Sequence, residues 1–224
     1  MKIAEFIKTN QAYFEDFITR STYNSNKIEG NTLSYAETYA VIFNDNEFAV
    51  KAKPRELYEA INHKYALSYV LEHLDEELNE KLIKDIAKQI NKNIDEIDGY
   101  RKVQVIINKA QYLPPAPELV PMQMMYFIDN YNNSNYEDVF EKIADSHIKF
   151  ERIHPFQDGN GRTGRLLITF EMLKNDLPPA IISANDRAEY FEFLASEDVN
   201  RLAEYLKKLS EEEKERIRTF EEIK

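Results

Sequence analysis

The residues best suited to chemistry lie in one stretch, His154 to Arg165, which reads His-Pro-Phe-Gln-Asp-Gly-Asn-Gly-Arg-Thr-Gly-Arg. His154 can accept a proton from a hydroxyl group, because the pKa of an imidazole lies near neutrality. Asp158 offers the hard oxygen that Mg²⁺ prefers, and this ion is usually held by one or two carboxylates together with substrate phosphates. Phe156, between these polar residues, is expected to point inward and to fix the loop to the core.

The glycine-framed turn in this stretch predicts a site for phosphate. Glycines let the backbone enter the left-handed region and bring amide N–H groups close to an anion. A helix is predicted over 162–173, because apolar residues recur on one face. Its N-terminus favours phosphate through unpaired amides and the helix dipole. Arg162 and Arg165, three residues apart, can both donate forked hydrogen bonds to phosphate oxygens. The residues of the predicted anion nest are Gly159, Asn160 and Gly161.

Composition limits the class of protein. The chain has 224 residues, which suits one substantial core, and few glycines among many helix-forming residues favour a helical fold. A net charge of −11 argues against a general nucleic-acid binder, which usually carries a basic surface. There is no cysteine, so disulfides and thiol catalysis are excluded.

The first residues lack the apolar core of a secretory signal, and no window approaches the length of a membrane span. Together with the absence of cysteine, this leads us to expect a cytoplasmic protein that binds neither membrane nor nucleic acid. The run that begins at Ser210 with three glutamates and a lysine predicts a separate charged helix, either solvated or in contact with a second copy of the chain.

Several elements are expected to position this stretch. Ser34 and Glu37 form a capping box that opens one helix, and Pro54 begins a long one. That long helix is predicted to turn Leu57, Ile61 and Tyr65 to one face. A helix from Val139 leads directly into the motif, and its His147 is best explained as a hydrogen-bonded structural histidine. Another amphipathic helix is predicted from Leu82, Ile83, Ile86, Ala87 and Ile90.

A short pattern near the N-terminus places Ser25 and Glu29 four residues apart, on one face of a predicted helix that ends at Gly30. Taken alone, it indicates only a helix stop with a solvated glutamate. A second pattern, over 101–115, alternates β-branched residues and then turns near Asn108–Lys109, which predicts a hairpin. On pattern alone, this hairpin either holds a ligand or simply closes the domain.

The stretch from His154 to Arg165 matches the signature His-Pro-Phe-x-Asp/Glu-Gly-Asn-Gly-Arg-x-x-Arg, so the chain resembles Fic-domain proteins (filamentation induced by cAMP). The resemblance implies a mainly helical, all-α fold with one short β-hairpin flap near the active site, in a single domain over 1–224. It further implies an N-terminal inhibitory helix at about 11–31, a flap hairpin at about 101–115, and a catalytic loop and helix start at 154–165.

The implied activity is protein adenylyltransfer, in which AMP passes from ATP to a Tyr, Thr or Ser hydroxyl of a target protein. His154 would be the base and Asp158 the Mg²⁺ ligand. Ser25 and Glu29 would belong to the inhibitory motif, with Glu29 paired to Arg165. The nucleotide would contact Gly159, Asn160, Gly161, Arg162, Arg165, Tyr190 and Phe191. The target would bind at the flap through Val105, Ile106 and Ile107.

Several alternatives stay open at this point. Glu29 could orient a water that removes AMP, which would make the chain a de-AMPylase. The fold could instead be a regulatory module whose binding of partners is gated by nucleotide. The target could be the chain itself, which would give auto-AMPylation. The chain could also form a homo-oligomer.

Overall fold

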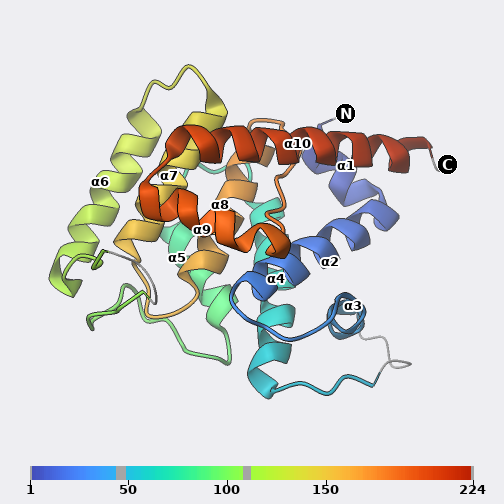
Figure 1. Cartoon of the computed structure of the whole chain (residues 1–224), viewed down its shortest axis with the longest axis horizontal. Helices are drawn as coiled ribbons and strands as arrows, with labels where there is room; N and C mark the ends of the chain where they lie inside the picture. Colours follow the sequence, from blue (N-terminus) through green and yellow to red (C-terminus); the bar gives the residue numbers. More distant parts are fainter. Residues whose placement is uncertain (1, 44–48, 108–111, 223–224) are drawn as a thin grey trace.

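The computed structural model describes residues 2–43, 49–107 and 112–222, and within these ranges the chain is helical with no strand (Figure 1). None of the helices in these ranges has the length and apolar character that a membrane span requires. The α-helices are α1 (Ile3–Thr9), α2 (Gln11–Ile28), α3 (Tyr35–Phe43), α4 (Pro54–Glu72), α5 (Glu80–Asn91), α6 (Val120–Asn133), α7 (Val139–Ile153), α8 (Asn160–Lys174), α9 (Arg187–Ser196) and α10 (Val199–Glu222). Two short 3-10 helices are η1 (Pro117–Leu119) and η2 (Ala184–Asp186).

Helix α8 lies in the middle of the molecule and contacts α2, α4, α5 and α7, while α10 runs across α7 (Figure 1). It begins at Asn160, two residues before the predicted start, and is buried on nearly all sides. The predicted apolar face is present, but Ile168 and Met172 are also fully buried. A helix that is apolar around most of its circumference belongs in the centre of a domain. The second half of the stretch from His154 to Arg165 therefore lies within this buried helix.

Three of the predicted helix boundaries are confirmed. Gly30 follows the end of α2 with a φ of +97°, which is where glycine is favoured. Ser34 and Glu37 exchange the two hydrogen bonds of a capping box, and Pro54 is the first residue of α4. The apolar residues predicted for α5 are all fully buried. Local sequence signals are thus sufficient to place these boundaries.

The predicted apolar face of α4 is wrong. Tyr65 is exposed and Leu57 is only half-buried, whereas the buried face carries Glu59, Asn62 and His63. Polar side chains are buried here because each finds a partner: the Asn62 amide donates to the carbonyl oxygen of Ile90 at 3.1 Å. The buried face of α4 therefore carries these polar side chains beside apolar ones such as Leu67 and Val70.

The glutamate run after Ser210 is not a separate helix, because it continues α10. Ser210 and Glu213 are buried within the chain. The Glu213 carboxylate accepts hydrogen bonds from the Tyr13 hydroxyl at 2.5 Å and from two nitrogens of Arg20 at 2.6 and 2.8 Å. Its charge is thus used to fasten α10 to α2, rather than being solvated.

The hairpin predicted over 101–115 is not found in the described residues, and its predicted turn at Asn108–Lys109 lies outside them. The buried guanidinium of Arg101 donates to the carbonyl oxygens of Val103 and Pro115, at 3.2 and 2.6 Å. Pro115 also has no N–H for a ladder. One side chain therefore holds the two limbs of this flap segment together where strand pairing was expected.

Candidate active site

His154 caps the C-terminus of α7 in the left-handed conformation, with a φ of +49° that is unusual for a residue other than glycine. Its Nδ1 lies 3.2 Å from the backbone carbonyl oxygen of Glu151. A carbonyl oxygen only accepts, so Nδ1 carries the proton and Nε2 keeps its lone pair. Burial lowers the pKa of His154, which keeps the imidazole neutral at pH 7. The ring is therefore prepared to accept a proton at Nε2.

The loop after His154 is fixed by its own side chains. Phe156 is fully buried, as predicted. The Asn160 amide donates to the Phe156 carbonyl oxygen at 2.8 Å, and its oxygen accepts from the Phe156 N–H at 2.9 Å. Gly159 has a φ of +76° at the N-cap of α8. A Cβ there would lie 2.6 Å from the Asn91 amide nitrogen, so glycine is required for space as well as for conformation.

Asp158 lies between two arginines on the cavity side of this loop. Its Oδ1 accepts from the Gly159 N–H at 2.6 Å and from Nη2 of Arg162 at 3.2 Å, and its Oδ2 accepts from Nη2 of Arg55. Burial opposes ionisation, but Arg162 and Arg55 outweigh it and hold the pKa of Asp158 below its usual value. The carboxylate is therefore ionised at neutral pH.

A magnesium ion fits this donor set only together with a nucleotide. In the described ranges, no group of three His, Cys, Asp or Glu side chains could hold a metal by itself. A single ionised carboxylate beside a phosphate site is, however, a common magnesium environment. Asp158 is the residue that would hold the ion.

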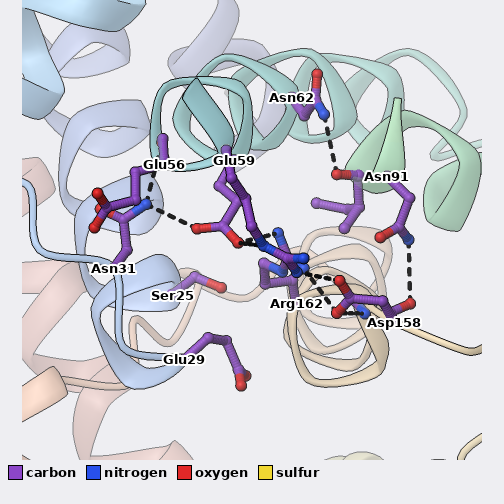
Figure 2. Close-up of polar contacts among 12 residues, drawn as sticks. Ser25, Glu29, Asn31, Glu56, Glu59, Asn62, Asn91, Asp158 and Arg162 are labelled. Atoms are coloured by element: carbon purple, nitrogen blue, oxygen red, sulfur yellow. Dashed lines mark hydrogen bonds and ion pairs between the residues drawn. The ribbon is translucent and has the colours of Figure 1, made fainter. Parts of the chain in front are cut away.

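Arg162 is almost wholly buried and is held from α4. Its Nη1 lies 3.5 Å from Oε1 of Glu59, a carboxylate that Asn31 also binds at 2.9 Å through Oε2. Figure 2 shows Glu59 and Asp158 on either side of this guanidinium. The residue predicted as a phosphate ligand is thus fixed in place before any ligand arrives.

Arg165 contacts both residues of the predicted inhibitory pattern. Its Nε donates to the Ser25 hydroxyl at 3.0 Å, and its Nη2 donates to the Ser25 carbonyl oxygen at 3.0 Å and to Oε1 of Glu29 at 2.6 Å. Burial alone would lower the pKa of Arg165, but the Glu29 carboxylate outweighs it and holds that pKa above its usual value. Ser25 in α2 and Glu29 at its C-cap thus accept hydrogen bonds from two nitrogens of the Arg165 guanidinium.

His154, Asp158 and Arg162 meet at one cavity of about 230 Å³, whereas Arg165 is not among the residues that line it. The residues that line it are Glu29, Arg55, Glu59, His154, Gln157, Asp158, Gly159, Asn160, Gly161 and Arg162. Most residues predicted from sequence for catalysis, metal and phosphate are therefore brought together.

The structure does not bring Tyr190 and Phe191 to this cavity. Tyr190 is fully buried, and its hydroxyl lies 2.7 Å from Nε2 of His147. Phe191 is half-buried beneath the guanidinium of Arg187, 4.4 Å from its ring centre. The predicted contact of these two residues with a nucleotide therefore stays a prediction. The same bond explains His147 as the structural histidine that was predicted.

Of the predicted target-binding residues, Ile106 is highly exposed, and Val105 and Ile107 are half-buried. Their segment is tied to the site by Arg101, whose Nε donates to the His154 carbonyl oxygen at 2.8 Å. Sequence reasoning missed Arg101, Arg55 and Glu59. The only local signal was the four-residue spacing of the last two, which any exposed helical ion pair would show.

Comparison with known proteins gives one consistent result. Residues 77–172 match the Fic/DOC family. The chain is 35% identical over 192 residues to the protein adenylyltransferase Fic of Nematostella vectensis, covering 82% of this chain and 43% of that protein. It is 30% identical over 205 residues to the protein adenylyltransferase fic-1 of Caenorhabditis elegans, covering 88% of this chain and 40% of that protein. The chain therefore spans less than half the length of these curated relatives.

Solved structures share the fold. A Fic-domain-containing signaling protein from Bacteroides thetaiotaomicron superposes with a TM-score of 0.76 at 25% identity, over 96% of this chain and 88% of that one. Fic-1 from C. elegans, solved over its residues 134–508, superposes with a TM-score of 0.75 at 28% identity, over 98% of this chain and 66% of that one.

Proposed function

This chain belongs to the Fic/DOC family, and we propose that it is a protein adenylyltransferase that transfers AMP from ATP to a hydroxyl group of a target protein. The observation that carries the proposal is the meeting of a neutral histidine, an ionised aspartate and a buried arginine at one cavity. The names of the curated relatives support the same activity. The single domain expected over 1–224 is part of the proposal.

In the reaction, Nε2 of His154 takes the proton of the target hydroxyl as its oxygen attacks the α-phosphorus of ATP. A P–O bond to the target forms, and the bond from that phosphorus to the pyrophosphate oxygen breaks. In-line attack is favoured when the base and the acceptor are held in fixed positions. The carbonyl oxygen of Glu151 provides this for the base, because it fixes the ring through Nδ1.

The negative charge that develops on the phosphates lies opposite the start of α8. The amides of 159–161 and the guanidinium of Arg162 are fixed before the nucleotide binds, so little reorganisation is needed during the reaction. A magnesium ion on Asp158, when bound, would neutralise part of the phosphate charge. Arg165 would bind the terminal phosphate once its guanidinium is free.

Autoinhibition follows from the state of Arg165. Its contacts to Ser25 and Glu29 occupy the donors that a terminal phosphate would need. ATP would then bind only in a pose unsuited to in-line attack. In this proposal, the region around 11–31 is the inhibitory helix and Glu29 is its active group.

The target is proposed to bind at the flap segment over 101–115, beside His154. Exposure of Ile106 and the direct link from Arg101 to the His154 carbonyl oxygen support this placement. A side chain offered here would have its hydroxyl near the base. The proposal covers modification of another protein and self-modification alike.

The test compares wild type with Glu29→Gly, each incubated with α-labelled or γ-labelled ATP in lysate. AMP transfer predicts that Glu29→Gly increases the label that α-labelled ATP leaves on protein, and that it leaves the labelling from γ-labelled ATP, which the kinases of the lysate produce, unchanged. Mass spectrometry of the labelled proteins gives the added mass and the modified residue. A matched control is Glu197→Gly, because Glu197 also caps a helix C-terminus and pairs with an arginine, Arg152, at 3.0 Å.

Two outcomes count against the proposal. If Glu29→Gly labels no more protein than Glu197→Gly does, the autoinhibitory role of Glu29 is wrong. If Glu29→Gly with His154→Ala still transfers label, His154 is not the base. Incubation of the same variants with an adenylylated protein also reveals any removal of AMP that depends on Glu29.

A further inference from the structure

The two oxygens of the Asp158 carboxylate have unequal partners. Oδ1 is held by the backbone N–H of Gly159 and by Arg162, whose side chain is 2% exposed. Oδ2 accepts from Arg55, whose side chain is 54% exposed, and no other donor reaches it within the described residues. One oxygen is therefore fixed by buried donors, and the other is covered by a donor that can leave.

Arg55 is tethered at one end only. Its Nε donates to Oε1 of Glu59 at 3.0 Å, one helical turn further along α4. Glu59 cannot follow a movement of Arg55, because Asn31 and Arg162 hold the same carboxylate. Figure 2 shows Glu59 between Asn31 on one side and Arg162 on the other. The outer nitrogen of Arg55 can therefore turn about its bond to Glu59 while the rest of the network stays in place.

A divalent cation at Asp158 needs Oδ2, since Oδ1 already accepts two hydrogen bonds. A guanidinium and a metal ion carry charges of the same sign and cannot share this oxygen. A polyphosphate in the cavity, which Arg55 also lines, offers the guanidinium several charged acceptors. Arrival of a nucleotide would thus draw Arg55 away from Asp158.

We propose that Arg55 is a displaceable cation that covers Oδ2 of Asp158 until a nucleotide polyphosphate takes it over, so that divalent metal and nucleotide bind cooperatively. This rests on the proposed function, because it takes Asp158 as the metal ligand and the cavity as the nucleotide site. By linkage, whatever the nucleotide adds to metal affinity the metal adds to nucleotide affinity. Removal of Arg55 reduces that coupling.

The test measures binding without turnover. Mn²⁺ is titrated into nucleotide-free protein and followed by electron paramagnetic resonance, and ADP affinity is then measured by calorimetry with Mn²⁺ present. Arg55→Met should bind Mn²⁺ alone about fivefold more tightly than wild type, which corresponds to loss of one exposed ion pair of about 1 kcal/mol. With Mn²⁺ present it should bind ADP about tenfold more weakly, as expected for loss of one charged hydrogen bond.

Arg55→Met should thus bind Mn²⁺ more tightly and ADP more weakly. If Arg55 had only a structural role, its replacement would weaken the binding of both. Arg55→Lys keeps a cation beside Asp158 and should stay near wild type for Mn²⁺. Arg218→Met is the matched control, because the Arg218 side chain is 56% exposed and pairs only with Glu215 on the surface in the described residues.

Asp158→Asn distinguishes a failure of the proposed metal site from a failure of the proposed role of Arg55. If it leaves Mn²⁺ affinity unchanged, the metal site of the proposed function is wrong. If it abolishes Mn²⁺ binding while Arg55→Met binds Mn²⁺ no more tightly than wild type, the role of Arg55 is overturned and the proposed function stands. A lack of detectable Mn²⁺ binding to Arg55→Met would equally overturn it, since a free Oδ2 would then not be enough.

Discussion

Replacing Glu213 with glutamine removes one charge from the contact between α2 and α10 and leaves the shape nearly unchanged. The Glu213 carboxylate is 5% exposed and accepts from Tyr13 and from both terminal nitrogens of Arg20. Glutamine keeps one acceptor oxygen but turns an NH₂ group toward a guanidinium or a hydroxyl. Arg20, whose side chain is 18% exposed, then retains only Asp16 as an ionic partner in the described chain.

The size of the effect follows from this burial. Removing one partner of a buried ion pair costs about 3–5 kcal/mol, because the other charge is left uncompensated. Since Asp16 still contacts Arg20 at 2.8 Å, we expect the lower end, about 3 kcal/mol. For a chain of this length, each kcal/mol lowers Tm by about 2–4 °C, which gives a decrease of about 6–12 °C.

Thermal and urea unfolding followed by circular dichroism measure this directly. Glu215→Gln is the control, because Glu215 lies on the same helix with a side chain that is 65% exposed. It should change the free energy of unfolding by no more than about 0.5 kcal/mol. If Glu213→Gln and Glu215→Gln lower Tm equally, the contact between α2 and α10 contributes no more than a surface pair, and the reasoning is refuted.

Two further predictions concern pH. Because the pKa of His154 is lowered, its imidazole stays neutral at a lower pH than that of an ordinary histidine. The rate of AMP transfer by Glu29→Gly should therefore fall to half at a pH below the usual histidine pKa of about 6.5. A midpoint at or above that value would contradict His154 as the base. Burial raises the pKa of Glu171 to about 8, so the stability from its neutral form is complete below its ordinary value of 4.5 and is lost as pH rises toward 8. Urea unfolding of Glu171→Gln should therefore show a shallower loss of stability between about pH 6 and pH 8, and an unchanged slope would argue against a neutral buried carboxyl.

The catalytic stretch could be predicted from sequence because its chemistry is contained in consecutive residues. One loop and one helix turn carry His154, Asp158 and Arg162, and local rules are enough to place them. Ser25 and Glu29 were predicted to share a helix face for the same reason. Their partner Arg165 lies more than a hundred residues away, and it was supplied by resemblance rather than by spacing.

What sequence could not supply is which residues from distant segments meet. The periodicity of α4 was interpreted through its apolar residues, so Arg55 and Glu59 were missed. Tyr190, which was predicted beside the nucleotide, is buried against His147 and does not line the cavity. In the flap segment, β-branched alternation predicted strands, but Arg101 takes the carbonyl oxygens that a ladder would have used. Each of these outcomes depends on a long-range partner.

The contacts of Arg101 also bear on how accurately the flap segment is positioned relative to His154. One buried guanidinium donates to Pro115 in the flap segment and to His154 at the catalytic loop, and the Arg101 N–H donates to the carbonyl oxygen of Pro155 at 2.9 Å. We therefore expect thermal displacements of the described flap residues and of His154 to be correlated. If the flap binds the target as proposed, the distance from its hydroxyl to Nε2 of His154 depends on these few hydrogen bonds rather than on contacts across the width of the domain.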